Sequence, residues 1–268
     1  MMLDAAVASR VASAERLRNG ISAMAWAELR KLRHDNIDIL TRSVQPLLWL
    51  FIFGTALRRN HALAGGFHDY RAYLAPGIMA QAALFIAIFF GLAVIWERDV
   101  GQLQRLLATP LPRLAIVLGK ATGAGIRALA QATVLLVALA ITGISIKWSI
   151  TGVIGALALL VLATGAFACL SMILASLVRT RERFMGIGQM IMMPLFFASS
   201  ALYPLSIMPT WLRILAHGNP LTYEVHGMRQ LLLGINAGGT LWADFLFVSA
   251  FLTITALIAG KLYPRAIL

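Results

Sequence analysis

The candidate functional side chains of this sequence are a few charged residues that lie close to long apolar segments. Charge inside a bilayer is costly, so such residues are candidates for function. Arg127 lies within an apolar run, where it could face a cavity, bind a partner helix or extend to the membrane surface. Glu224 and Arg229 lie in a later polar stretch, where they could pair with each other, form an exposed surface pair or contact a second subunit. We predict that these three residues line a substrate path or a dimer interface.

Patterns typical of enzymes are missing from the sequence. The pair Gly119–Lys120 lacks the upstream glycine of a nucleotide-binding P-loop, so this chain is not expected to hydrolyse ATP by itself. No HExxH or GxSxG motif occurs. One enzymatic alternative stays open, a membrane-embedded transferase that uses His217, His226 and Glu224, although they show no nucleophile-and-base pattern. No catalytic residue is therefore predicted.

The sequence also predicts no metal site and no bound cofactor. His61 and His68 share a polar loop, but histidines without further ligands are usually solvent-exposed. Cys169 is the single cysteine and lies in an apolar run, so no disulfide is expected. The net charge of +12 comes from basic residues scattered beside apolar runs rather than from a basic stripe. This distribution favours contact with membrane lipid over nucleic acid.

The elements that position these residues are membrane helices. Of the 268 residues, 60% are hydrophobic and 13% charged, and the mean hydropathy is +0.81. This balance indicates an integral membrane protein. The first twenty residues contain Arg10, Arg16 and Arg18 and no apolar core, which argues against a cleaved signal peptide.

A span needs about 20 apolar residues, and the apolar runs predict an all-α membrane protein with six transmembrane helices in one domain, 1–268. A cytoplasmic tail and an interfacial helix are expected within 1–36, and short re-entrant outer helices within 204–240. The predicted spans are 37–57, 73–96, 114–146, 149–178, 184–203 and 241–262.

The segment 97–112, ERDVGQLQRLLATPLP, is a polar interruption between the second and third predicted spans. Its spacing predicts one short amphipathic helix with Glu97 and Asp99 in the first turn, ended by Pro110 and Pro112. Its predicted faces are Val100, Leu103 and Leu107 on one side, and Arg98, Gln102, Arg105 and Thr109 on the other.

Two further patterns concern helix packing. The segment 22–36 places Trp26, Leu29 and Leu32 on one helical face, which favours an interfacial helix over a solvated one. Gly119, Gly123 and Gly125 form a small-residue face suited to close helix packing. Such a glycine pattern is common in membrane helices and does not identify the helix that packs against it.

The distribution of positive residues predicts the orientation. With both termini inside, the inner segments carry 16 of the Lys and Arg residues and the outer segments carry 6. Positive residues concentrate on the cytoplasmic side, so both termini and the segment 97–112 are expected in the cytoplasm.

The segment ERDVGQLQRLLATPLPRLAIVLGK after the second span and NPLTYEVHGMRQLLLG before the sixth resemble the permease subunit of ABC-2 type exporters, over nearly the whole chain. In that family the matching stretch is a coupling helix that seats in a groove of a cytoplasmic ATPase. The resemblance implies two permeases, identical or related, and two ATPases that use ATP and Mg. It implies ATPase contacts by Glu97, Arg98, Asp99, Gln102 and Arg105.

The function expected from these observations is export of an amphipathic substrate across a prokaryotic inner membrane, driven by ATP hydrolysis in a separate subunit. The substrate could be a drug, a lipid or a lipid-linked saccharide. Besides the transferase, an ATPase-independent channel or scaffold is the remaining alternative.

Overall fold

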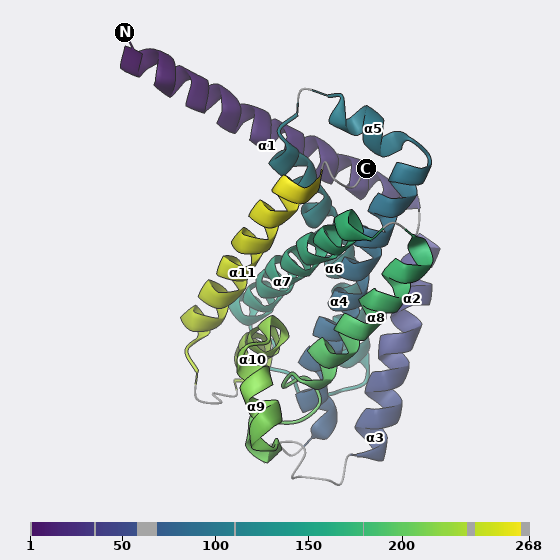
Figure 1. Cartoon of the computed structure of the whole chain (residues 1–268). Coiled ribbons are helices and arrows are strands. Elements are labelled where there is room, and N and C mark those ends of the chain that lie inside the picture. The colour runs from purple at the N-terminus through teal and green to yellow at the C-terminus, as the bar shows by residue number, and fades with distance from the viewer. Residues whose placement is uncertain are drawn as a thin grey trace.

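A computed structural model describes residues 2–34, 36–57, 69–109, 111–178, 180–234 and 239–263. Within these ranges the regular structure is helical, with no strand, which confirms the predicted all-α class (Figure 1). The helices are α1 Met2–His34, α2 Asn36–Leu48, the π-helix η1 Trp49–Phe53, α3 Gly54–Ala56, α4 Tyr70–Asp99, α5 Gln102–Leu107, α6 Arg113–Ile141, α7 Ile150–Leu177, α8 Arg181–Phe197, the 3-10 helix η2 Leu205–Ile207, α9 Thr210–His217, α10 Pro220–Leu233 and α11 Leu241–Leu262.

Five helical segments of the described chain are long and apolar enough to cross a membrane. They are Ile39–Ala56, Tyr70–Asp99, Arg113–Ile141, Ile150–Leu177 and Leu241–Leu262. The predicted third span, 114–146, is longer than the helix, because α6 ends at Ile141 and residues 142–149 are not helical.

The predicted span 184–203 corresponds to α8, which has 17 residues and ends at Phe197. At about 1.5 Å per residue it is about 26 Å long, slightly less than the roughly 30 Å of a hydrocarbon core. The helix contains Pro194 and continues to Phe197, and the chain turns at Ala198. Whether α8 crosses the membrane therefore stays a prediction.

The centre of the bundle is α7, which packs against α4, α6, α10 and α11. Small residues let the helices approach closely where α7 meets α4. A Cβ added at Gly91 would overlap the hydroxyl of Ser171, whose Oγ donates to the Ile88 carbonyl at 2.9 Å. This packing fixes the register of the two helices that lie deepest in the bundle.

The helix α1 packs along the first half of α6 through the predicted glycine face. Cβ atoms added at Gly119 and Gly123 would lie 2.7 Å from Met24 Cβ and 2.6 Å from Glu28 Cγ. The close packing expected of the glycines is confirmed, with α1 as the partner of Gly119 and Gly123, whereas a Cβ added at Gly125 would lie 2.9 Å from Val161 of α7. Trp26, expected on the apolar face, is 57% exposed. The amino-terminal half of α1 extends away from the bundle (Figure 1).

The two ends of the bundle carry different elements. Figure 1 shows α5 and the carboxyl end of α11 at one end, which we call the α5 end. The short helices α9 and α10 lie toward the opposite end, which we call the α9 end. The candidate functional residues fall into one group at each end.

Candidate functional site

The connection between α4 and α6 differs from the single helix that the sequence predicted. The helix α4 continues through Glu97 and ends at Asp99, and α5 starts only at Gln102. Gly101 between them has φ 71°, a left-handed conformation that breaks the helix and favours glycine. Consequently Val100 is 66% exposed and Leu103 fully buried, so the prediction that they share one face is wrong. Pro110 lies outside the described residues.

The acidic residues of this connection lie in the last turn of α4 instead of the first turn of a new helix. The carboxylate of Glu97 accepts a hydrogen bond from Lys120 Nζ of α6 at 2.5 Å. Asp99 pairs with Arg181 of α8 at 2.7 Å and with Arg98 at 3.3 Å. These cations offset the unfavourable position of two carboxylates at a helix carboxyl terminus. They also tie α4 to α6 and α8.

The short helix α5 is anchored by one side chain and otherwise faces outward. Leu103 packs into a cluster that includes Val94, Ile116 and Phe184. Gln102 and Arg105 are exposed. Of the five predicted ATPase contacts, Asp99 is exposed as well, but Glu97, Arg98 and Asp99 already have partners within the chain.

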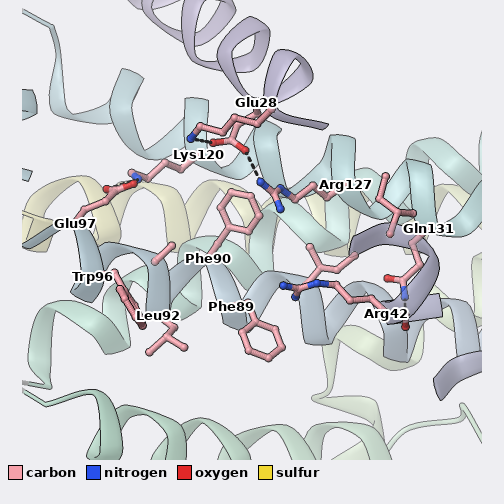
Figure 2. A pocket seen from close by; sticks show the side chains of 14 residues that line it. Glu28, Arg42, Phe89, Phe90, Leu92, Trp96, Glu97, Lys120, Arg127 and Gln131 are labelled. Carbon is pink, nitrogen blue, oxygen red and sulfur yellow. Dashed lines mark hydrogen bonds and ion pairs between the residues drawn. The ribbon is translucent and has the colours of Figure 1, made fainter. Parts of the chain in front are cut away.

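A cavity of about 370 Å³ lies beside this connection (Figure 2). Its described walls come from α1, α2, α4 and α6. It lies between these helices, near the α5 end of the bundle. The helix α4 contributes aromatic and aliphatic side chains and Glu97, and the other three helices contribute the remaining charged side chains. The lining residues that matter below are Glu28, Arg42, Phe89, Phe90, Trp96, Glu97, Lys120, Arg127 and Gln131.

Ion pairs and aromatic rings hold the charges of this cavity in place. Arg127 Nη2 lies 3.2 Å from a Glu28 carboxylate oxygen, a contact between residues 99 positions apart. Its guanidinium lies 5.7 Å from the ring centre of Phe90, and that of Arg42 lies 5.1 Å from Phe89. Such cation–π contacts stabilise a cation that has left bulk water. Of the three alternatives left open for Arg127, the structure shows it lining a cavity and pairing with another helix, and its role in a substrate path stays a prediction.

The carboxylate of Glu28 is the anion at the centre of this group. Burial by itself would raise the pKa of Glu28, but the hydrogen bond from Lys31 and the charge of Arg127 outweigh it and hold the pKa below its usual value. A group with a lowered folded pKa stabilises the fold above its unfolded pKa, and this contribution is lost as the pH falls through the folded value.

We therefore expect Glu28→Gln to lower the free energy of unfolding in detergent by about 2 kcal/mol at pH 7. The difference from wild type should shrink as the pH falls from about 4.5, the unfolded value, through the lower folded value, where the carboxylate of the folded protein becomes protonated. Thermal unfolding between pH 7 and about pH 3 measures it. Glu15→Gln, at an exposed position of the same helix, is the matched control and should show no comparable difference. A deficit of Glu28→Gln that is independent of pH contradicts this assignment.

The family model described as ABC-2 type transporter matches residues 19–233 of the chain. The chain belongs to the ABC-2 type transporter family. The resemblance stated from the two sequence segments is thereby confirmed. The chain is a transport component of this family, and its apolar helices make it a multi-pass membrane protein.

Individual relatives support the same assignment. The ycf38 transport permease of Cyanophora paradoxa is 28% identical over 226 residues, 84% of this chain and 77% of the relative. Nodulation protein J of Rhizobium leguminosarum bv. trifolii is 30% identical over 200 residues, 74% of each chain. The daunorubicin resistance ABC transporter permease protein DrrB1 of Streptomyces coeruleorubidus is 22% identical over 210 residues, 78% of this chain and 73% of the relative.

The α9 end of this ABC-2 permease holds the other two predicted site residues, and both are buried. Arg229 of α10 donates to the carbonyl oxygens of Tyr73 and Ala201 at 3.2 and 2.9 Å and lies over the Tyr73 ring. Both carboxylate oxygens of Glu224 lack a hydrogen-bond partner among the described residues. The predicted Glu224–Arg229 pair is therefore not formed, and the exposed-pair alternative is wrong because the two residues are only 1% and 5% exposed.

The three residues of the transferase alternative have separate surroundings in the permease. His217 Nδ1 lies 2.6 Å from the Arg213 carbonyl oxygen, whereas His226 Nδ1 lies 2.8 Å from Asp244 Oδ2 of α11. Burial raises the pKa of Glu224 well above its usual value. His61 and His68 lie outside the described residues.

Sequence reasoning missed Glu28, Arg42 and Gln131 as members of the cavity. Gln131 carries a usable signal, because an amide in the middle of an apolar run needs a polar partner or a polar ligand. Glu28 and Arg42 carry none, since charged residues near the membrane surface are common.

Proposed function

We propose that this ABC-2 permease exports an amphipathic substrate from the cytoplasm or the inner leaflet. A separate ATPase subunit binds and hydrolyses ATP with Mg, and this chain supplies the membrane path without a cofactor of its own. Two permeases, identical or related, and two ATPases form the transporter. The DrrB1 relative, named for daunorubicin resistance, supports outward transport of an amphipathic compound.

The observation that carries this proposal is the construction of α5. It is a short polar helix, exposed at Gln102 and Arg105, that joins two long apolar helices through brief connections. Leu103 fastens it to the cluster that holds Val94 of α4 and Ile116 of α6, and the Glu97–Lys120 pair ties α4 to α6. A partner that displaces α5 therefore displaces α4 and α6 with it. We infer that α5 is the coupling helix that contacts the ATPase.

In this proposal the helices α1 and α8–α10 take the places expected from the sequence. The helix α1 lies at the cytoplasmic interface, α8 is the fifth of six spans, and α9 and α10 form the outer re-entrant region. The apolar side chains of α8 support a membrane position, since Met190, Met193 and Phe197 are 71%, 50% and 44% exposed. Lipid or the second permease would cover them.

The orientation follows from charge and from the arrangement of the ends. The carboxyl end of α11 and α5 lie at the same end of the bundle (Figure 1). The bias of 16 to 6 in basic residues favours the cytoplasm for this end. The membrane is then the inner membrane of a prokaryotic cell, with both termini inside.

The cavity at the α5 end supports an amphipathic substrate. Its walls combine aromatic rings of α4 with charged groups from three other helices. A ligand with an apolar part and a charged part can pack against the aromatic rings and pair with the charged groups, whereas a small hydrophilic ion would make no contact with the rings.

Mapping the exposure of single cysteines tests this layout. Cysteine replaces Gln104, Lys147, Glu182 or Trp211, all exposed, in a Cys169→Ala background. A membrane-impermeant maleimide added to intact cells should label positions 147 and 211 only, and positions 104 and 182 only after the membrane is opened. Labelling of position 104 from outside contradicts a cytoplasmic α5. Protection of position 211 in intact cells contradicts a crossing by α8.

A further inference from the structure

A second cavity, of about 110 Å³, adjoins the first one. The two cavities share Arg42, Ile86, Phe89 and Gln131 as lining residues. The second cavity reaches further along α2 and α4, to Trp49 and Gln81, away from the α5 end. We call these two adjacent cavities together the joined cavity.

Gln131 of α6 stands at the junction and has an unused hydrogen-bond acceptor. The residue is 5% exposed, and its Nε2 donates to the main-chain oxygen of Arg42 at 2.9 Å (Figure 2). A main-chain oxygen can only accept, so the amide nitrogen must face Arg42 and the Oε1 atom must face the other way. The Oε1 atom is buried and has no partner among the described residues. A buried acceptor without a donor costs free energy, so a ligand that donates there gains affinity.

Further uncharged polar side chains line the same part of the joined cavity. Gln45 and Thr41 of α2 and Gln81 of α4 belong to the second cavity. Trp49 and Phe85 line the same cavity with apolar surface. Amide groups beside aromatic faces suit a ligand that carries hydroxyl or amide groups on an otherwise apolar frame.

The charge at the wider part of the joined cavity favours an anion. The described lining of the first cavity contains four cations and two carboxylates, an excess of two positive charges: Lys31, Arg42, Lys120 and Arg127 against Glu28 and Glu97. Arg127 and Gln131 are four positions apart on α6, so they share one face with Cβ atoms about 5–6 Å apart. An anionic group at Arg127 thus places a neighbouring donor group near Gln131.

We propose that the joined cavity binds an anionic amphiphile with a hydroxyl or amide donor close to its charged group, and that Gln131 selects for that donor. This proposal rests on the proposed function, since it assigns the substrate class of the same transporter. The cations around Arg127 hold the anionic group, Phe89 and Phe90 pack against the apolar part, and Gln131 Oε1 accepts the hydrogen bond.

Two matched probes test the role of Gln131. N-dodecanoylglycine and N-dodecanoylsarcosine have the same charge and chain, but the second carries a methyl group in place of the amide hydrogen. The full chain is reconstituted in phosphatidylcholine nanodiscs, and binding of tritiated N-dodecanoylglycine is measured at concentrations below micelle formation. Wild type should prefer the glycine probe by about fivefold or more, the effect of about one hydrogen bond. Dodecyltrimethylammonium, a cation with the same chain, should compete poorly.

Substitutions assign the effect to the residue. Gln131→Leu should abolish the preference for the glycine probe, and Gln131→Glu should weaken binding of both anionic probes. Thr133→Val, an exposed position of the same helix, is the matched control and should bind like wild type. Equal affinity of wild type for the three probes, or a preference that survives in Gln131→Leu, overturns the proposal.

Failure of this proposal can be told apart from failure of the proposed function. Arg105→Glu tests contact with the ATPase, and Arg105 does not line the joined cavity. That variant should bind N-dodecanoylglycine like wild type. ATP-driven transport by a permease that does not bind the probe overturns only the ligand proposal. Probe binding by a permease that no ATPase drives overturns only the proposed function and leaves the binding site supported.

Discussion

Arg105→Glu is expected to abolish co-purification of the permease with its ATPase and to lower ATP-driven transport at least tenfold. Arg105 is an exposed cation of α5 and lies beyond the internal pairs that occupy Arg98 and Asp99. In Arg105→Glu a carboxylate replaces the guanidinium that is expected to contact the ATPase surface. Like charges across an interface cost several kcal/mol, and 1.4 kcal/mol already corresponds to a tenfold loss of affinity. Co-purification and transport assays on the same membrane preparation measure both effects.

The control for Arg105→Glu is the same charge reversal at a site far from α5. Lys147 is exposed in the connection between α6 and α7, which lies at the other end of both helices. Lys147→Glu should leave ATPase association and transport close to wild type. Arg98→Glu is a poorer test, because it also breaks an ion pair inside the chain. Normal association and transport by Arg105→Glu would remove α5 from the coupling mechanism.

The second large effect is expected at Gly77 of α4, where two backbone segments touch. A Cβ at this position would overlap the carbonyl oxygen of Ala201 and lie 2.8 Å from its carbonyl carbon. The same oxygen accepts a hydrogen bond from Arg229 at 2.9 Å, so a shift of residue 201 also disturbs the buried guanidinium. Backbone atoms have no rotamer that relieves such an overlap. Gly77→Ala should therefore lower the free energy of unfolding by about 3 kcal/mol.

Thermal unfolding in detergent and the yield of folded protein measure the effect of Gly77→Ala. The matched control is Gly186→Ala in α8, because a Cβ there meets no atom within 4 Å. Alanine is a better helix former than glycine, so this control should be neutral or stabilise the protein by about 0.5–1 kcal/mol. Equal stability of the two variants would contradict the close approach of α4 and residue 201.

Patterns along the chain were sufficient for the membrane class and the family. Runs of apolar residues must be helical in a bilayer, because every main-chain polar group needs a partner within its own segment. The segments around Glu97 and Asn219 resembled those of ABC-2 permeases, and the family model matches residues 19–233. The helical periodicity predicted a single helix through Gly101, which is wrong, because periodicity does not detect a single left-handed residue between two helices.

Hydropathy and contiguous motifs are local properties, and they were enough to identify a helical membrane protein of the ABC-2 family. Which residues share a site became clear from the folded bundle. It joined Glu28 to Arg127 and Glu97 to Lys120, buried Glu224 away from Arg229, and left the Gln131 oxygen without a donor. The physical reason is that ion pairing and desolvation depend on distances across the packed bundle, and no spacing along the chain encodes those distances.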